Sequence, residues 1–140
     1  MGLIVQKYGG ATLETPAKIK NAAKRLAELK NDGHQVVAVV SAMGQTTNQL
    51  LDLSQQVSSN PLLRELDMLL SVGERISMSL VSIALNDLKQ EAISLTGSQA
   101  GILTNDSHIN AMIIDVKAHR VTEALNNNKI AIVAGFQGVS

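Results

Sequence analysis

Short apolar runs alternate along the chain with longer segments in which apolar residues recur every three or four positions. The runs are typical of strands, and the longer segments are typical of amphipathic helices. We predict strands at residues 3–7, 35–41, 91–96 and 130–134. We predict a helix from Pro16 to just before Gly33, a second that carries Leu50, Leu53 and Val57, a third over roughly 61–88 and a fourth over 117–126. A small hairpin is expected from residues 102–104 and 111–116.

Local signals mark where two of these helices begin. Thr15 is suited to cap the first helix, with Pro16 at its first position, and Asn60 and Pro61 are suited to the same roles in the third. In the third helix, one apolar stripe consists of Leu62, Leu66, Leu69, Gly73, Ile76, Leu80 and Ile83. A glycine inside a helix costs about 1 kcal/mol relative to alanine, so Gly73 indicates close approach by a backbone or a ligand.

The alternation of strands and helices predicts an α/β fold with a parallel sheet and right-handed crossovers. The strand at 35–41 is apolar at consecutive positions, which favours a sheet covered on both faces. Ligands of such sheets bind beyond the carboxyl ends of the strands. Those ends are residues 7–10, 41–44, 96–97 and 135–138, and each contains glycine. Both aromatic residues, Tyr8 and Phe136, also fall there.

Composition narrows the class of protein. The 140 residues, 45% apolar and 17% charged, fit one ordinary domain with a real core. Twelve Lys and Arg balance twelve Asp and Glu, which argues against a general nucleic-acid or acidic-membrane binder. Cysteine is absent, which excludes disulfides, thiolate zinc sites and cysteine nucleophiles. The N-terminus has no signal-peptide pattern, and unbroken apolar runs such as 36–40 are far shorter than the ~20 residues of a membrane span, so we expect no membrane segment.

Lys7, Gly9 and Gly10 are candidates for a phosphate site. Glycines let backbone N–H groups crowd around an anion, and a lysine beside them supplies a point charge. The pattern is neither a Walker A loop nor G-x-G-x-x-G. The alternative is a tight turn with a solvated lysine.

Glu74 and a set of hydroxyl residues are the other candidates. Glu74 follows Gly73 on a partly apolar helical face, where a carboxylate needs a partner. The partner is either the amine of a substrate or a lysine or arginine of this chain. The third alternative is that the Glu74 side chain is exposed to solvent. Ser41 and Thr47, with Thr46, could bind a carboxylate or could cap a helix. The three histidines have no metal-ligand spacing and are interpreted as ordinary surface or capping residues: His34, His108 and His119.

Five motifs, in order along the chain, resemble those of the aspartokinases. They are residues 7–12 (Lys-Tyr-Gly-Gly-Ala-Thr), 39–48 (Val-Val-Ser-Ala-Met-Gly-Gln-Thr-Thr-Asn), 64–74 (Arg-Glu-Leu-Asp-Met-Leu-Leu-Ser-Val-Gly-Glu), 95–101 (Leu-Thr-Gly-Ser-Gln-Ala-Gly) and 133–139 (Val-Ala-Gly-Phe-Gln-Gly-Val). The resemblance implies the amino acid kinase fold, a three-layer αβα sandwich with a mainly parallel sheet. It also implies transfer of a phosphoryl group from MgATP to the β-carboxylate of L-aspartate, the first step toward lysine, threonine and methionine.

Residue roles follow from the same resemblance. Lys7 is expected to neutralise charge on the transferring phosphoryl group, as the catalytic residue, and Gly9, Gly10 and Thr12 to complete the ATP phosphate site. Ser41, Thr47 and Glu74 are expected to hold aspartate, with Glu74 facing its amine. The resemblance places no metal ligand among these residues; the expected cofactors are ATP and Mg²⁺.

Some positions depart from the family. Ala11 replaces a threonine, Leu103 replaces a common arginine, and residues 108–112 (His-Ile-Asn-Ala-Met) stand where members often have His-Gly-x-Ala-Arg. We expect residues 1–140 to be the N-terminal part of the kinase domain, without an ACT regulatory domain. We expect the isolated chain to fold and oligomerise without catalysing, and the enzyme to be cytoplasmic. The alternatives are another amino acid kinase, or a non-catalytic fragment that binds ligand or oligomerises.

Overall fold

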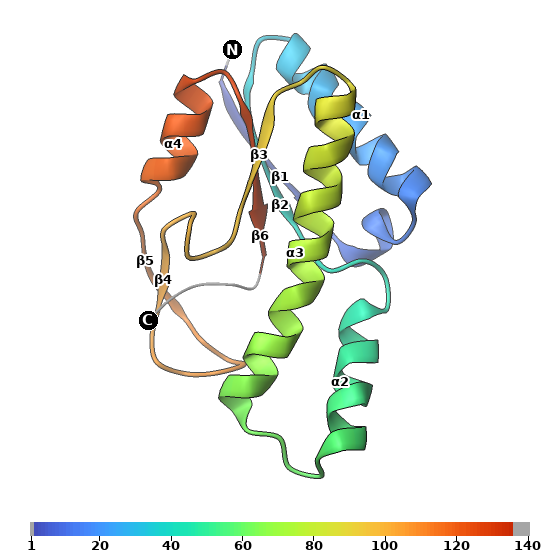
Figure 1. The fold of residues 1–140 in the computed structure, drawn as a ribbon. Coiled ribbons are helices and arrows are strands. Elements are labelled where there is room, and N and C mark those ends of the chain that lie inside the picture. Colours follow the sequence, from blue (N-terminus) through green and yellow to red (C-terminus); the bar gives the residue numbers. More distant parts are fainter. Residues whose placement is uncertain (1, 136–140) are drawn as a thin grey trace.

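The computed structural model describes residues 2–135, and over this range it has the predicted α/β fold. One sheet contains β1 (Leu3–Tyr8), β2 (Gln35–Val40), β3 (Ala92–Leu95) and β6 (Ile130–Ala134) in the order β1-β2-β6-β3, all parallel (Figure 1). A separate antiparallel hairpin contains β4 (Ile102–Thr104) and β5 (Ile113–Val116). The predicted strands, their parallel pairing and the small hairpin are therefore confirmed.

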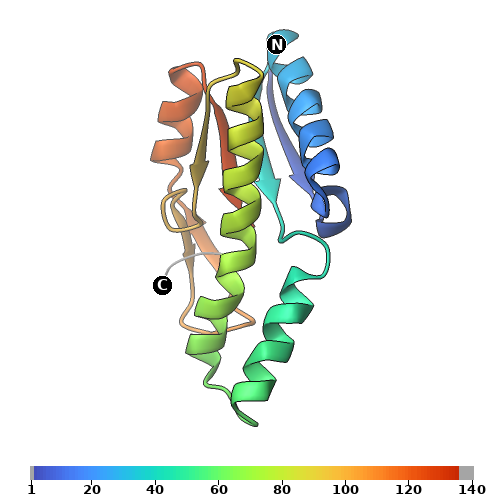
Figure 2. The ribbon, with the colours of Figure 1, turned by 45° about the vertical axis from the view of Figure 1, so that its right-hand side comes forward.

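Helices cover both faces of the sheet and make three layers. On one face, α1 (Pro16–Asn31) and α3 (Leu63–Asp87) lie side by side (Figure 2). On the other face lies α4 (His119–Asn126). Because side chains alternate along a strand, β2 sends Val36, Ala38 and Val40 into the first core and Val37 into the second. The expected αβα sandwich is confirmed.

The first helix, α1, begins and ends as its sequence predicts. The Thr15 hydroxyl accepts a hydrogen bond of 3.2 Å from the backbone N–H of Lys18, and Pro16 occupies the first turn. This bond satisfies one of the N–H groups that a helix start leaves without a partner. Past the other end, Gly33 adopts a φ of 96°, a left-handed conformation that glycine reaches without a steric penalty.

The start of α3 differs from the prediction. Neither Asn60 nor Pro61 begins the helix, because Leu62 occupies the N-cap position and Leu63 is the first helical residue. Leu62 has an extended backbone and makes no side-chain capping bond. The two residues that we expected to cap and start the helix belong instead to the connection from the preceding helix, α2 (Thr46–Val57).

The buried face of α3 also differs from the predicted apolar stripe. Its buried residues are Gly73, Glu74, Ser77, Met78, Val81, Ser82 and Leu85. Leu62 and Ile83, from the predicted stripe, are 75% and 64% exposed. The reason is that small residues form much of the contact face, so the helix packs closely against the sheet and α1. The predicted stripe shares only Gly73 with this face, because counting large apolar residues gives no weight to Ser77 and Ser82.

Of the helices in residues 2–135, α3 is long and apolar enough, by length and composition, to cross a membrane. Our expectation from unbroken apolar runs did not anticipate this. The observation is weak, since the core helix of a soluble protein meets the same test. In this structure, α3 packs on the sheet through its C-terminal two thirds. Its first turns extend past the sheet beside α2, which has no buried residues (Figure 1).

Candidate active site

The loops that follow β1 and β2 are joined at the carboxyl edge of the sheet. The backbone N–H of Ser41 donates to the carbonyl of Tyr8 at 3.1 Å, and that of Gly44 donates to the carbonyl of Gly10 at 2.9 Å. A Cβ at position 10 would lie 2.9 Å from the Ala42 carbonyl oxygen. Gly10 is thus the residue that allows the two loops to meet.

Helix α3 and strand β6 reach the same edge. A Cβ at Gly73 would lie 2.7 Å from the Cβ of Ala42 and 3.5 Å from Cγ2 of Thr46. From β6, the N–H of Gly135 donates to the carbonyl of Val40 at 2.8 Å. The structure therefore brings the first two motifs together with the Gly73-Glu74 turn of α3, as the sequence led us to expect for strands that end on one side.

Glu74 is the buried acid of this region. Its side chain is 6% exposed, and burial raises the pKa of the Glu74 carboxyl above its ordinary value, while a hydrogen bond from its own backbone N–H opposes that rise. The ion pairs found among the described residues join Lys18 to Glu14, Arg64 to Glu65 and His108 to Asp67, and none of them involves Glu74. Of the readings that the sequence left open, exposure is excluded, and the described residues provide no internal ion pair. The carboxylate can therefore receive a cation from a ligand.

The hydroxyl residues Ser41 and Thr47 belong to the segment that packs against the Gly73-Glu74 turn through Ala42 and Thr46. Both residues are half-buried, and neither side chain forms a hydrogen bond within residues 2–135. The N-cap of α2 is Gln45, which makes no side-chain capping bond. In the described structure, therefore, no side chain of Ser41, Thr46 or Thr47 caps a helix. Their hydroxyls can donate to an acceptor that is not part of the chain.

Lys7 approaches the edge from the other face of the sheet. It pairs in register with Val39, which packs on the α4 side, so its side chain lies on the face opposite α1 and α3. Glu74 belongs to α3, on the first face. A cationic and an anionic side chain thus come to one edge from opposite faces.

Gly9 and Thr12 differ in their surroundings. Gly9 is extended (φ −78°, ψ 169°), and no atom of the described residues lies within 4 Å of the place where its Cβ would be. Its backbone is therefore open to a close-approaching group. Thr12 lies in the short helix η1 (Gly10–Leu13) and lines a shallow hollow of about 290 Å³ with Lys18, Asn21 and Arg25. Within residues 2–135, the structure does not place Thr12 with Ser41, Thr47 and Glu74.

A larger open hollow, about 420 Å³ in volume, adjoins these loops. It is lined by Glu14, Thr15, Met43, Gly44, Gln45, Thr46 and Gln49. Of the residues proposed to bind phosphate or the amino acid, Thr46 alone lines it, so this hollow lies next to the candidate site and does not coincide with it. The described residues contain no group of three or more His, Asp or Glu side chains that could hold a metal ion.

Two expectations about single residues need correction or restriction. Tyr8 is 5% exposed and belongs to the first core, with its hydroxyl donating to Oε1 of Gln6 at 2.7 Å, so its ring does not line the site. The burial of Tyr8 raises the pKa of its hydroxyl. Phe136, Gln137 and Gly138, which we expected at the end of β6, lie outside the described residues.

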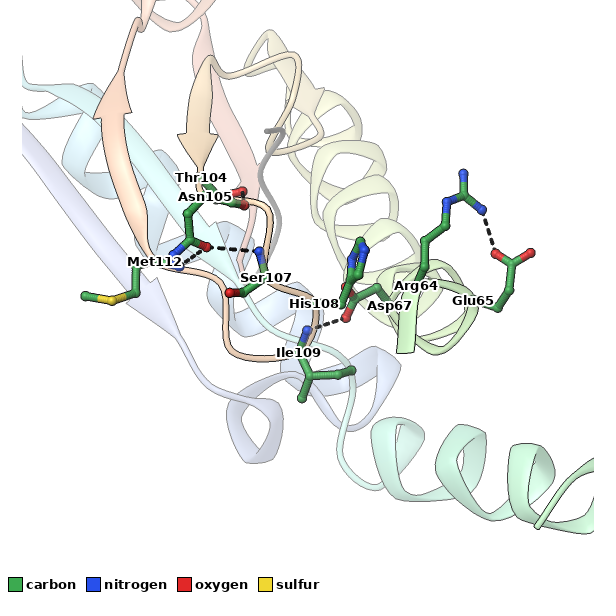
Figure 3. A network of polar contacts seen from close by, with 9 residues as sticks. All are labelled: Arg64, Glu65, Asp67, Thr104, Asn105, Ser107, His108, Ile109 and Met112. Carbon is green, nitrogen blue, oxygen red and sulfur yellow. Dashed lines mark hydrogen bonds and ion pairs between the residues drawn. The ribbon is translucent and has the colours of Figure 1, made fainter. Parts of the chain in front are cut away.

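Sequence reasoning missed the contact between α3 and the loop of the β4–β5 hairpin. The Asp67 carboxylate lies 2.9 Å from Nδ1 of His108 and accepts a 2.9 Å hydrogen bond from the backbone N–H of Ile109 (Figure 3). We had interpreted His108 as an ordinary surface residue. The two partners are 41 residues apart in the chain, so no local sequence pattern predicts that they pair.

Comparisons with known proteins agree with this arrangement. The model of the amino acid kinase family matches residues 2–140. Aspartokinases of Corynebacterium efficiens and Bacillus subtilis (aspartokinase 2) are 56% and 49% identical over 140 residues. They match all of this chain, which spans about a third of their length (33% and 34%). The resemblance to aspartokinases is thereby confirmed.

Solved structures show the same fold. Aspartate kinase from Synechocystis superposes with a TM-score of 0.82 at 45% identity, over 97% of this chain and 22% of that one. Aspartokinase III of E. coli, solved with aspartate and ADP, gives a TM-score of 0.78 at 19% identity, over 96% of this chain and 40% of that one. At 19% identity, the similarity to aspartokinase III shows only that the two proteins share a fold.

Proposed function

The chain belongs to the amino acid kinase family, and on that basis we propose that it forms part of an aspartokinase, which transfers a phosphoryl group from ATP to the β-carboxylate of L-aspartate. The observation that carries the proposal is Glu74. A buried carboxylate without an ion-pair partner in the described residues is costly unless something compensates it. The α-ammonium group of an amino acid is a compact cation that can do so, and the proposal assigns Glu74 to it.

Ser41 and Thr47 complete the amino-acid side of the proposed site. Their hydroxyls make no hydrogen bond to the described protein, and each can donate to a carboxylate. The loop that carries Ser41 touches the Gly73-Glu74 turn through Ala42, while Thr47 lies one residue after Thr46, which also contacts that turn. An amino acid bound with its ammonium at Glu74 would therefore have hydroxyl donors nearby.

The phosphate side of the proposed site consists of Lys7, Gly9, Gly10 and Thr12. In phosphoryl transfer to a carboxylate, a carboxylate oxygen bonds to the γ-phosphorus, the bond from that phosphorus to the bridging oxygen breaks, and ADP leaves. Catalysis of this step depends mainly on positioning and on charge stabilisation. Lys7 supplies positive charge at the edge of the sheet, and the open backbone at Gly9 allows phosphate oxygens to approach closely. Thr12 lines the separate hollow with Lys18, Asn21 and Arg25, so its assignment rests on the family resemblance alone.

Mg²⁺ would enter with the nucleotide. The described residues hold no cluster of metal-binding side chains, so no step of the transfer is assigned to a protein-bound metal. We further propose that the chain is the N-terminal part of the kinase domain, that the enzyme acts in the cytoplasm as a homo-oligomer, and that its product feeds lysine, threonine and methionine synthesis.

The test of the proposed function measures turnover in a full-length context. Because the chain spans about a third of its relatives, residues 1–140 are joined to the remaining part of the Corynebacterium efficiens aspartokinase, and we call this protein the chimera. Aspartate-dependent release of ADP from MgATP is expected from the chimera and not from residues 1–140 alone. Glu74→Gln should raise the KM for aspartate about a hundredfold, as expected for loss of a buried ionic contact, and leave the KM for ATP within about twofold.

Glu65→Gln is the matched control, because Glu65 lies on the same helix but is exposed and pairs with Arg64. It should leave both constants unchanged. Equal increases in the two KM values of Glu74→Gln would point to a structural role for the acid. No ADP release from the chimera with aspartate would overturn the assignment of the substrate.

A further inference from the structure

The hairpin loop, residues 105–112 between β4 and β5, is a preformed unit. The side chain of Asn105 accepts hydrogen bonds of 3.2 Å from the backbone N–H groups of Ser107 and Met112 (Figure 3). The N–H of Asn105 also donates to the carbonyl of Met112 at 3.0 Å. These bonds lie within the loop, so they fix its shape without fixing where it lies on the rest of the molecule.

Asp67 is the residue that attaches this loop to the kinase fold. One carboxylate oxygen meets Nδ1 of His108 and the other accepts the N–H of Ile109, both at 2.9 Å. Among residues 2–135, these are the hydrogen bonds that join the hairpin loop to another element. An exposed ion pair contributes little by itself. Here the same carboxylate also holds a backbone group, so its two bonds fix both the position and the direction of the loop.

The attachment point faces the proposed site. Asp67 precedes Glu74 by seven residues, or two helical turns, so the two acids share one face of α3 and lie about 10 Å apart along its axis. Figures 1 and 2 both show the loop crossing from the hairpin to the N-terminal half of α3, beyond the end of β6. The loop therefore lies past the carboxyl edge of the sheet, on the side where the ligand is expected.

We propose that Asp67 is a positioning residue that holds the hairpin loop as a wall of the amino-acid site next to Glu74. The inference rests on the proposed function, since it assigns the loop to the aspartate side of that site. Asp67 touches neither reacting group. Asp67 acts on the site only through His108 and the backbone of Ile109. Substitution of Asp67 should therefore weaken the affinity for the amino acid and leave the rate of the chemical step unchanged.

The kinetic test compares variants of the chimera. Asp67→Ala should raise the KM for aspartate about tenfold, the effect of losing charge-assisted hydrogen bonds, with kcat and the KM for ATP within about twofold. Asp67→Asn keeps an oxygen for the N–H of Ile109 and should raise that KM only about threefold. His108→Ala should lie between the two. The matched control is Glu65→Ala, whose side chain points away from the loop in Figure 3 and should leave every constant unchanged.

Amide hydrogen exchange on the same proteins provides a readout that does not depend on turnover. Residues 105–112 should exchange faster in Asp67→Ala than in the parent, and saturating aspartate should slow them in the parent. Faster exchange with an unchanged KM for aspartate would show that Asp67 holds the loop but that the loop is not part of the site, which overturns the inference. A parent chimera without aspartate-dependent turnover would instead overturn the proposed function and, with it, this inference.

Discussion

Gly73 packs directly against Ala42, so that a methyl group added at position 73 would meet the Ala42 side chain at 2.7 Å. Real Cβ atoms essentially never approach this closely, and the obstacle is not the flexible end of a side chain. The contact joins the middle of α3 to the loop after β2. It therefore sets how near Glu74, the next residue, lies to Ser41 and Thr47.

Gly73→Ala should destabilise the fold by about 1–2 kcal/mol. Overpacking of a tight contact destabilises a protein by about 1–3 kcal/mol. The better helix propensity of alanine offsets at most about 1 kcal/mol of this loss. Urea unfolding of residues 1–140 measures the change. Gly9→Ala is the control, because no described atom would crowd a methyl group there and the backbone is extended. It should stabilise the protein by about 0.4–1 kcal/mol, because alanine lowers the entropy of the unfolded chain. Equal effects of the two substitutions would show that the tight contact carries no stability.

Glu74 should make the free protein less stable as the pH rises. Its pKa in the folded state is raised above the ordinary 4.5, so between those two values the folded state binds more protons than the unfolded state. The free energy of unfolding must then fall as pH increases through this window and stay low above it. Glu74→Gln, which cannot ionise, should be more stable than the parent at pH 7 and equally stable at pH 4.

Thermal unfolding of the parent and of Glu74→Gln across this pH range checks the prediction. Adding aspartate at pH 7 should recover stability in the parent and not in the variant, because the ammonium group compensates the ionised carboxylate. A difference between the two proteins that stays constant with pH would mean that Glu74 does not change its protonation on unfolding.

Lys7→Ala should lower kcat of the chimera about a hundredfold, with the KM for ATP within about twofold. A charge that acts mainly on the developing transition state affects the chemical step more than binding. Steady-state kinetics with both substrates varied make the measurement. Lys20→Ala removes an exposed lysine of α1, away from the site, and should have no effect. An unchanged kcat would remove Lys7 from the mechanism.

Ile109→Gly should stabilise the protein by up to about 1 kcal/mol. Ile109 has a φ of 70°, a conformation that costs an L-residue about 1–2 kcal/mol, while the unfolded-state entropy of glycine returns about 0.5–1 kcal/mol. Asn128→Gly, at a φ of 61°, should gain less because asparagine tolerates that conformation. Urea midpoints compare the two, and a less stable Ile109→Gly would show that packing of the isoleucine outweighs its strain.

The sequence predicts what depends on neighbouring residues. The strand runs, the Thr15–Pro16 start of α1 and the stop at Gly33 all rest on interactions within a few residues, and each is confirmed. The start of α3 is wrong in our prediction because a suitable Asn60–Pro61 pair is not used when Leu62 already leads into the helix. Propensity at a helix end is worth about 1 kcal/mol, which packing of the connection readily overrides.

The rest depends on contacts between distant segments. The buried face of α3 is chosen by how closely Gly73 and Ser77 let it approach the sheet, which periodicity of large residues does not report. The pairing of Asp67 with His108 depends on where the hairpin lies, and the sheet order alone does not fix this. At the candidate site, the sequence indicated an acid that needs a partner, and the structure adds that residues 2–135 contain no ion-pair partner for it.

The strand order has a consequence for synthesis on the ribosome. Strand β6 lies between β2 and β3, although it follows them in the chain, so β3 has no partner strand until residues 130–134 have emerged. At the usual 5–20 residues per second, roughly 5–20 s separate the completion of β2 from that of β6. During this interval, one edge of β2 and both edges of β3 have no partner strand. Slow codons or a pause between residues 95 and 130 would prolong the exposure and favour capture by chaperones that bind extended apolar segments.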